Sequence, residues 1–336
     1  MQRVAIIGAG FIGGAHALAC YNSVLIELVA ICDVRADSAK ELAQKYGCSH
    51  YSDAEAMLAE IGDGIDIVDV CVPTFLHKQN VLLAAKHGKH IVCEKPVTMK
   101  LEDMDEILNA VKEAGVKFMA AQVLRFWPEY VEIKRMYDDY EFGGIKMVYA
   151  NRLAEHPNWT DWHRDPEKSG GALFDLHYHD IDAVAWMFGP VERVYAVGWQ
   201  SQTGCHNHVV SSLTFKNGVK AVVEGAIEMS EGYPFTMNMR VVGGLKTADF
   251  AMSAGYNIED LASSCRDLIV YAEGAYPVKT YVEVSEDAYQ TQLDYFAKCV
   301  GNNEPLTVIT PEETREVLKI VLAIKESLET GRVVVM

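Results

Sequence analysis

The first 122 or so residues alternate short apolar runs with stretches of helical periodicity, and this alternation restricts the fold more than any other feature. The apolar runs are continuous, which is typical of strands that carry helices on both faces. We therefore expect residues 1–122 to form an α/β domain with a doubly wound parallel sheet. The strands are predicted at Val4–Gly8, Glu27–Cys32, Ile65–Val72, His90–Cys93 and Lys117–Ala121, and the helices near 13–22, 36–46, 53–60, 77–87 and 101–114.

From about residue 123 the pattern changes to a few helices and many consecutive strands. Lys216-Asn217-Gly218 lies between two strand-like runs and predicts a hairpin. Thr310 is expected to cap the last helix, with Pro311 in its first turn. Residues 123–336 are therefore predicted to form an α+β domain with a large, mostly antiparallel sheet. Its helices are expected at Pro128–Tyr140, 171–188, 286–301 and 311–329, and its strands at 145–153, 191–200, 207–215, 219–229, 235–242, 245–250, 267–271 and 278–284.

Composition excludes several classes of function. Thirty basic against 47 acidic residues give a formal charge of −17, which disfavours binding to nucleic acid or to an anionic membrane surface. No apolar run approaches the roughly 20 residues that cross a bilayer, and the N-terminus does not resemble a signal peptide. The eight cysteines show no CxxC pair, and several lie inside apolar runs. These features predict a reduced, cytoplasmic protein.

A glycine motif follows the first predicted strand. Gly8, Gly10 and Gly13 match GxGxxG, with Phe11 and Ile12 between the last two, and a helix is expected directly afterwards. Asp33 lies 20 residues beyond Gly13, at the end of the next strand. This arrangement is the Rossmann fingerprint, in which backbone N–H groups at the helix start bind a pyrophosphate. An aspartate at this position accepts hydrogen bonds from ribose hydroxyls and repels a 2′-phosphate, so NAD is favoured over NADP, although Arg35 could weaken that preference.

Two further segments carry candidate catalytic groups. Glu94-Lys95-Pro96 follows a predicted strand, at the carboxyl edge where such sheets bind ligands. Asp175, His179 and Asp182 are spaced so that they would share one face of a single helix, with His177 on the other side. An Asp–His pair provides a base near neutrality for a hydroxyl proton, and a lysine can stabilise developing negative charge on the oxygen.

Together these motifs resemble the glucose–fructose oxidoreductase/inositol dehydrogenase (Gfo/Idh/MocA) family, and the resemblance covers nearly the whole chain. It implies NAD(P)-dependent redox chemistry on sugars, inositols or their derivatives. Matched by position, the catalytic set would be Lys95, Asp175 and His179, with His179 as acid/base. The nicotinamide would lie near Glu94-Lys95-Pro96 and the 71–77 loop, which includes Pro73, Thr74 and His77. His177 departs from the family pattern, where many members have glycine.

Substrate contacts are expected from two segments rich in aromatic and polar residues. Aromatic rings stack on a sugar's apolar face, while polar side chains bind its hydroxyls. Trp162 could alternatively pack the seam between the domains, and Arg125 could simply pair with an acidic side chain. A metal site built from the scattered histidines is not predicted, because His177 and His179 would face apart on a helix. The candidates are Gln122, Arg125 and Trp127 after the last strand of the first domain, and Trp162 and Arg164 in the 158–165 loop.

Three functions remain open at this stage. The first is an NAD-dependent dehydrogenase acting on a secondary alcohol of a sugar or cyclic polyol. The second is a redox-neutral enzyme that oxidises a sugar carbon with tightly held NAD⁺, cleaves a glycosidic bond and regenerates the cofactor. The third is a regulator that senses nucleotide or sugar without chemistry. The alternating Val, Ala, Ile and Met of 219–229 and 235–242 also predict an uncovered apolar sheet face, and hence a homodimer or homotetramer.

Overall fold

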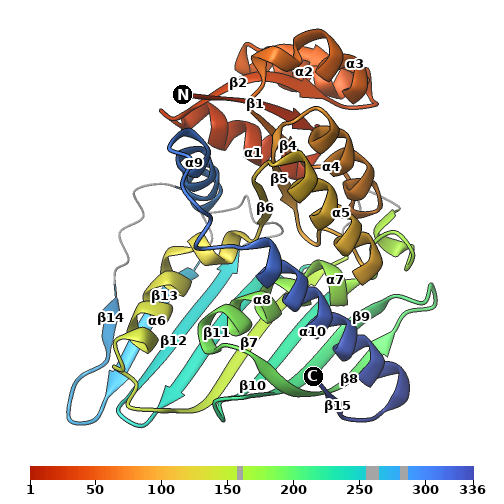
Figure 1. Ribbon diagram of the computed structural model, residues 1–336. Coiled ribbons are helices and arrows are strands. Elements are labelled where there is room, and N and C mark those ends of the chain that lie inside the picture. Colours follow the sequence, from red (N-terminus) through yellow and green to blue (C-terminus); the bar gives the residue numbers. More distant parts are fainter. Residues whose placement is uncertain (157–161, 255–264, 281–286) are drawn as a thin grey trace. The chain divides into compact units, whose positions relative to one another are not determined.

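A computed structural model of the chain describes residues 1–156, 162–254, 265–280 and 287–336. It divides into two compact units. The first unit comprises Met1–Phe126 and Ser285–Leu318, and the second comprises Trp127–Val284 and Lys319–Met336. Each unit has its own sheet and its own buried apolar core (Figure 1).

The first unit is built on a six-stranded parallel sheet in the order β3-β2-β1-β4-β5-β6. This is the order of a doubly wound dinucleotide-binding fold, and it confirms the predicted fold class. Strand β4, inside the sheet, and strand β6, at its edge, are both buried along their length, which explains their continuous apolar sequences. The strands are β1 (Gln2–Ile7), β2 (Ile26–Cys32), β3 (Ser49–Tyr51), β4 (Ile67–Val70), β5 (His90–Glu94) and β6 (Phe118–Ala121).

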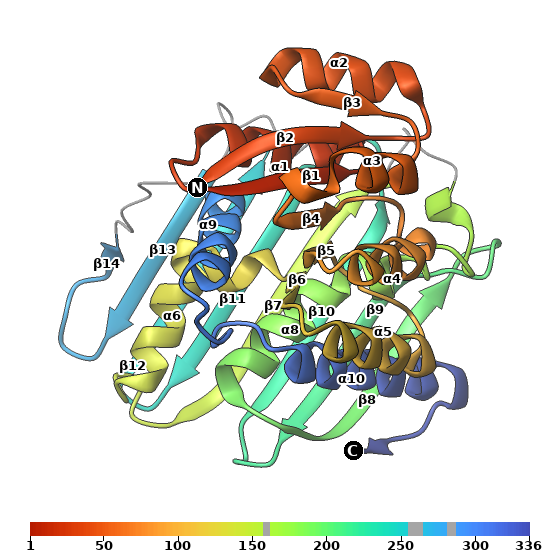
Figure 2. The ribbon, with the colours of Figure 1, turned by 45° about the horizontal axis from the view of Figure 1, so that its top comes forward.

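Helices pack around this sheet in two groups. Helices α1, α2 and α9 form one group, and α3, α4 and α5 form the other (Figure 2). Helix α9 follows all but the last strand of the second sheet in sequence, but it packs on α1 and β1. The first unit is therefore discontinuous, whereas the sequence analysis assigned 123–336 to one domain. The helices are α1 (Phe11–Asn22), α2 (Ala36–Tyr46), α3 (Ala54–Ile61), α4 (His77–Lys86), α5 (Leu101–Ala114) and α9 (Ala288–Gly301), with short 3₁₀ turns at Gly62–Gly64, Thr74–Leu76 and Val123–Phe126.

The second unit is built on a nine-stranded sheet in the order β14-β13-β12-β11-β7-β10-β9-β8-β15. Its pairs are antiparallel except β7 with β10, which confirms the mostly antiparallel prediction. Gly218, at φ +88°, closes the predicted hairpin between β9 and β10. The strands are β7 (Ile145–Glu155), β8 (Val191–Gln200), β9 (His206–Phe215), β10 (Lys220–Met229), β11 (Phe235–Gly243), β12 (Lys246–Ala254), β13 (Cys265–Ala272), β14 (Val278–Thr280) and β15 (Val334–Val335).

Helices α6 (Pro128–Asp138) and α8 (His177–Phe188) lie on one face of this sheet (Figure 1). That face holds the Val, Ala, Ile and Met side chains that the sequence analysis assigned to an uncovered surface. Met237, for example, is fully buried and contacts Arg152, which pairs with Asp180 of α8. The expectation for these residues is wrong, because alternation shows which side chains share a face and not which face the helices cover.

One further prediction needs correction, and two strands were missed. The helix expected over 171–188 is interrupted at Leu176, giving α7 (Ala172–Asp175) and α8, although no glycine or proline breaks the run. The short edge strand β3 and the terminal strand β15 were not predicted. Three predicted segments extend beyond the described residues: the strand at 278–284 at its residues 281–284, a helix at its residue 286, and the aromatic loop at its residues 158–161.

The last helix of the chain is α10 (Pro311–Thr330). Within the described ranges no helix combines the length and apolar character needed to cross a membrane.

Candidate functional site

The glycine turn after β1 has the geometry that its sequence requires. Gly8 adopts φ +114°, and a Cβ there would collide with the Cys71 carbonyl oxygen. A Cβ on Gly13 would collide with the carbonyl oxygen of Gly8, so α1 can approach β1 only with glycine at this position. A Cβ on Gly10, in contrast, would meet no atom within 4 Å. The backbone at Gly10 is therefore open for the close approach of a ligand, at a helix start with no side-chain cap.

Asp33 braces this turn from the end of β2. Its Oδ2 accepts a hydrogen bond from the Ala9 N–H at 2.8 Å, and its Oδ1 accepts one from the Arg35 N–H at 2.8 Å. The Arg35 guanidinium also pairs with the carboxylate, Nε to Oδ1 at 3.2 Å. Burial alone would raise the pKa of Asp33, but the hydrogen bonds from Arg35 and Ala9 lower it overall. The carboxylate is therefore ionised beside the glycine turn, which suits a ribose diol.

The predicted cofactor segments lie at the carboxyl ends of neighbouring strands. The 71–77 loop follows β4, and Glu94-Lys95-Pro96 ends β5. His77 joins the two, because its Nε2 lies 2.8 Å from the Val72 carbonyl oxygen and its Nδ1 lies 2.9 Å from the Pro96 carbonyl oxygen. Burial lowers the pKa of His77, while the hydrogen bonds with the Pro96 and Val72 carbonyl oxygens act in the opposite direction. Thr74 is buried nearby in the chain and Pro73 is half-buried, while Phe11 and Ile12 line the start of α1, Phe11 being exposed.

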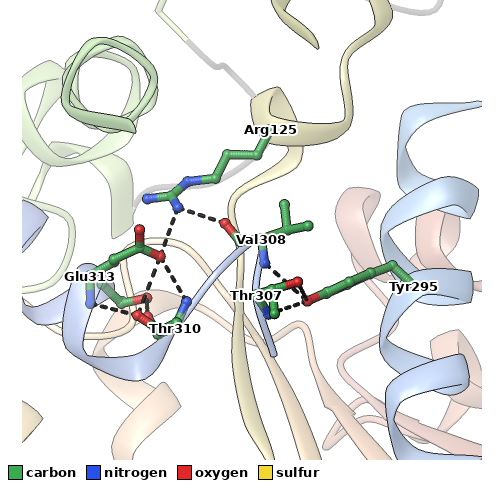
Figure 3. A network of polar contacts seen from close by, with 7 residues as sticks. Arg125, Tyr295, Thr307, Val308, Thr310 and Glu313 are labelled. Atoms are coloured by element: carbon green, nitrogen blue, oxygen red, sulfur yellow. Dashed lines mark hydrogen bonds and ion pairs between the residues drawn. The ribbon is translucent and has the colours of Figure 1, made fainter. Parts of the chain in front are cut away.

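Gln122 and Arg125, both predicted to bind substrate, follow β6. Both polar side-chain atoms of Gln122 are buried, and in the described part of the chain neither has a hydrogen-bond partner. The Arg125 Nη1 donates to the Val308 carbonyl oxygen at 2.7 Å and to Glu313 Oε2 at 3.0 Å (Figure 3). Gln122 therefore retains hydrogen-bonding capacity, whereas one nitrogen of Arg125 is committed to a structural contact.

Figure 3 shows why Arg125 is held there. Thr310 Oγ1 accepts a hydrogen bond from the Glu313 N–H at 3.1 Å, and Glu313 Oε2 accepts one from the Thr310 N–H at 3.0 Å. This reciprocal capping box confirms Thr310 as the cap of α10. Arg125 pairs with the same Glu313 carboxylate, and its predicted contact with substrate stays a prediction.

The remaining predicted substrate residues lie in the second unit. Trp127 is 8% exposed, and the Arg266 guanidinium carbon lies 5.0 Å from its ring centroid. Trp162 and Arg164 form a 3₁₀ turn, in which the Trp162 ring stacks on His163 with centroids 3.9 Å apart. Arg164 is exposed. Their contacts with a substrate stay predictions.

The predicted acid/base pair lies across the interruption between α7 and α8. Asp175 is the last residue of α7, and His179 lies in the first turn of α8. Both are half-buried, and so is Lys95 in the first unit. His177, between them in sequence, is fully buried and faces the sheet instead: its Nε2 lies 2.8 Å from Ser211 Oγ.

Sequence reasoning missed one cluster in the first unit. His16, Asp69 and Cys71 place a nitrogen, an oxygen and a sulfur within 4.8 Å of one another, all fully buried. These residues come from α1, from β4 and from the position just after it, so no local motif joins them. An aspartate inside the apolar run Ile67–Val70 was the available signal, because a buried charge requires a partner.

The parallel sheet, the glycine turn and the braced aspartate define a dinucleotide-binding protein of the Rossmann class, with a second, sheet-rich unit. Comparison with known proteins identifies the class further. The Gfo/Idh/MocA oxidoreductase family, NAD-binding Rossmann fold, matches residues 2–122, and the Gfo/Idh/MocA C-terminal domain matches residues 130–248. The chain belongs to the Gfo/Idh/MocA family of NAD(P)-dependent oxidoreductases.

Three similar proteins represent the comparison. The myo-inositol 2-dehydrogenase of Thermotoga maritima is 29% identical over 342 residues, 98% of this chain and 97% of that protein. A 2,7-anhydro-N-acetylneuraminate hydratase of Mediterraneibacter gnavus is 29% identical over 187 residues, 55% of this chain and 49% of that protein. The aldose-aldose oxidoreductase of Caulobacter crescentus, solved with glycerol, superposes with a TM-score of 0.87 at 20% identity over 100% of this chain and 99% of that one, which shows the shared fold.

Proposed function

We propose that the protein removes a hydride from a secondary alcohol of a sugar, an inositol or a related polyol, using NAD⁺. The observation that carries the proposal is the first unit's carboxyl edge, where the Asp33-braced glycine turn and the Glu94-Lys95-Pro96 turn follow strands of one sheet. The full-length similarity to a myo-inositol dehydrogenase supports the substrate class. When bound, the nicotinamide would accept the hydride.

The chain's own residues would manage the proton and the charge. His179 would take the hydroxyl proton as the alcohol carbon loses its hydride, and Asp175 would orient the ring. The Lys95 ammonium would stabilise negative charge that develops on the reacting oxygen. These roles rest on the resemblance of the three positions to the family's catalytic set. Among the predicted substrate ligands Gln122 is the best supported, because its two polar side-chain atoms have no hydrogen-bond partner among the described residues.

NAD is preferred over NADP in this proposal. A 2′-phosphate beside the ionised Asp33 would be repelled, and the Arg35 guanidinium that could attract it is already paired with that carboxylate. We also place the protein in the cytoplasm, on the strength of its cysteines: all eight lie in the described ranges and are unpaired, and six of them are buried.

The experiment is nicotinamide reduction by the purified protein, with NAD⁺ and NADP⁺, over a panel of inositols, aldoses and glycosides. We expect reduction of NAD⁺ by one stereochemical group of alcohols. Lys95→Met and His179→Ala should each lower kcat by roughly 10²- to 10⁴-fold. Lys40→Met and His50→Ala, at exposed positions outside the predicted site, are controls that should leave kcat unchanged. Normal turnover by His179→Ala would remove this histidine from the mechanism.

The hydratase relative favours one second candidate, a redox-neutral reaction that oxidises a sugar carbon transiently and returns the hydride. The same assay separates the two. Net NADH formation supports the dehydrogenase, whereas a cleaved or hydrated product without NADH supports the redox-neutral enzyme. A protein that binds NAD without either product would act as a sensor.

A homo-oligomer through the sheet of the second unit is also proposed. The open face carries exposed Tyr149, Tyr195, Val197 and Trp199, beside polar pairs such as His208 with Glu224 at 2.7 Å. Large exposed aromatic side chains on a sheet face are typical of interfaces. Light scattering should give the mass of a dimer or tetramer, and Trp199→Glu should shift it toward the monomer. A monomeric mass for the unmodified protein would contradict the proposal.

A further inference from the structure

The buried cluster that the sequence analysis missed connects three elements of the first unit. His16 on α1 is fully buried, and its Nδ1 lies 2.8 Å from Asp69 Oδ2 on β4. On the other side of the ring, Nε2 lies 3.1 Å from Glu94 Oε1 on β5. The imidazole thus lies between two carboxylates, and both carboxylates are buried as well.

Glu94 extends this connection to the turn that follows β5. While its Oε1 faces His16, its Oε2 accepts a hydrogen bond from the Lys95 N–H at 3.0 Å. One carboxylate therefore links the helix that begins at the glycine turn to the backbone of Lys95. A carboxylate held at both oxygens has little freedom, and so the amide that it binds has little freedom either.

The contacts favour a positively charged ring. Nδ1 makes a hydrogen bond with Asp69, whereas Nε2 lies within ion-pair distance of Glu94 without hydrogen-bond geometry, so the second carboxylate favours a positive ring through its charge. Burial would lower the pKa of His16, but Asp69 and Cys71 raise it well above its ordinary value. The other groups around the ring are the Cys71 sulfur, 3.4 Å from Nδ1, and the Tyr289 ring of α9, with centroids 5.6 Å apart. Cys20, on the same helix, and Asp294, which binds Ser23 Oγ, complete the titratable groups nearby.

The same atoms could be considered as metal donors, since a nitrogen, an oxygen and a sulfur lie close together. Without a metal, burial raises the pKa of the Cys71 thiol strongly, whereas a bound metal would itself deprotonate the thiol. Nδ1 makes a charge-assisted hydrogen bond with Asp69 at 2.8 Å, and Nε2 makes an ion-pair contact with Glu94 at 3.1 Å. A protonated ring accounts for both contacts without a metal, and a zinc measurement distinguishes the two.

We propose that His16 is a positioning residue, which as an imidazolium joins Asp69 to Glu94 and thereby fixes the turn that carries Lys95. The inference deepens the proposed function, because Lys95 is the group assigned to the reacting oxygen. It also couples the phosphate-binding helix α1 to the catalytic turn, since His16 lies one turn after Gly13. The contacts that provide this coupling lie between helix α1 and strands β4 and β5, and they do not involve the substrate.

The first experiment measures amide hydrogen exchange in the protein without cofactor, by NMR. In His16→Asn we expect the Lys95 amide to exchange roughly tenfold faster, as when a hydrogen bond to a charged group is weakened. Core amides of β1, such as that of Ile6, should keep their rates. His208→Asn is the matched control, because it removes a histidine–glutamate pair from the second unit and should leave Lys95 unchanged.

Several results would overturn the inference. An unchanged Lys95 amide in folded His16→Asn would show that the ring does not hold the turn. Equal acceleration of the β1 amides would show general destabilisation instead of positioning. Stoichiometric zinc in the purified protein, lost in His16→Asn, would assign the cluster to a metal. If His16→Asn does not fold, Glu94→Gln, which keeps the shape of the side chain and removes its charge, replaces it in the same measurement.

A second measurement addresses the ring itself and is independent of any substrate. Imidazole ¹⁵N shifts of the unmodified protein should show His16 doubly protonated at about pH 7.5, above the ordinary histidine pKa of about 6.5. A neutral ring at that pH would contradict the bridge. In the enzyme assay, His16→Asn should lower kcat more than it raises the KM for NAD⁺. If no substrate is turned over, the proposed function fails, but the exchange rates and ¹⁵N shifts still decide the role of His16.

Discussion

Two fully buried histidines, His16 in the first unit and His177 in the second, lie on helices that face a sheet, and their surroundings differ sharply. His16, in the first unit, has a carboxylate at each ring nitrogen. His177, in the second unit, has the Ser211 hydroxyl at Nε2, and its Nδ1 has no hydrogen-bond partner among the described residues. Both side chains are 0% exposed. The two side chains are therefore equally buried, and any difference between their pKa values comes from the groups that surround each ring.

The neighbouring groups give the two rings different charges. Burial would lower the pKa of His16, but the Asp69 carboxylate beside the ring raises it overall. Burial with no compensating charge lowers the pKa of His177 to about 3, so this ring is neutral. A Cβ on Gly225 would lie 2.8 Å from the Cβ of His177, so the sheet accommodates the histidine with a glycine beneath it. The comparison indicates that His16 carries an electrostatic role and that His177, the departure from the family pattern, has a packing role.

The largest expected difference is in stability. His16→Leu leaves two buried carboxylates without their cation, and we expect it to lower the free energy of unfolding of the first unit by about 3–5 kcal/mol. His177→Leu leaves only the Ser211 hydroxyl without its partner, so the second unit should lose about 1–3 kcal/mol. Because a two-unit protein need not unfold in one step, the slowest-exchanging amides of each unit should be measured separately.

The two leucine variants control for each other, since both remove a buried imidazole from a helix facing a sheet. Equal losses in the two units would contradict the charge difference and indicate a neutral ring at both positions. A loss of stability in the unit that does not carry the substitution, with the mutated unit unchanged, would show that the stability of one unit depends on the other.

The first unit was largely predictable because its constraints are local in sequence. Gly8, Gly10 and Gly13 lie in one short motif, and Gly13 is required by a contact within that turn. The Asp33 side chain, at the end of the next strand, accepts a hydrogen bond from the turn's Ala9 N–H. The parallel sheet was also predictable from local sequence, because its strands are continuous apolar runs. The cluster at His16 escaped because its members lie 53 residues apart or more along the chain, except for Asp69 and Cys71.

The second unit was predictable in class and less so in detail. Alternating strands and the turn at Gly218 predicted an antiparallel sheet, yet alternation did not reveal which face the helices cover. The interruption at Leu176 had no signal either, since its backbone stays in the right-handed helical region at φ −91° and ψ −49°. One i→i+3 bond, from the His179 N–H to the Leu176 carbonyl oxygen at 3.2 Å, accompanies it. Asp175 and His179 therefore belong to two helices, although their spacing fits one.

The smallest predicted effect concerns pH and sharpens the comparison further. In the unfolded chain His177 titrates near its ordinary pKa of about 6.5, whereas in the fold it stays neutral down to about pH 3. Below about pH 6.5 the unfolded state therefore binds a proton that the folded state does not, and stability falls as pH falls, by up to about 1.4 kcal/mol per pH unit. His177→Leu should remove this part of the slope in the second unit.

His16 should show the opposite dependence. Its raised pKa means that its stabilising contribution is complete below the unfolded pKa of about 6.5 and is lost as pH rises through the folded value. The stability of each unit should be measured between about pH 5 and pH 9 for the unmodified protein and for each leucine variant. The difference between variant and unmodified protein removes the pH dependence that comes from carboxylates present in both. The His177 difference should change on the acid side and the His16 difference on the alkaline side, because one ring excludes a proton that the other retains.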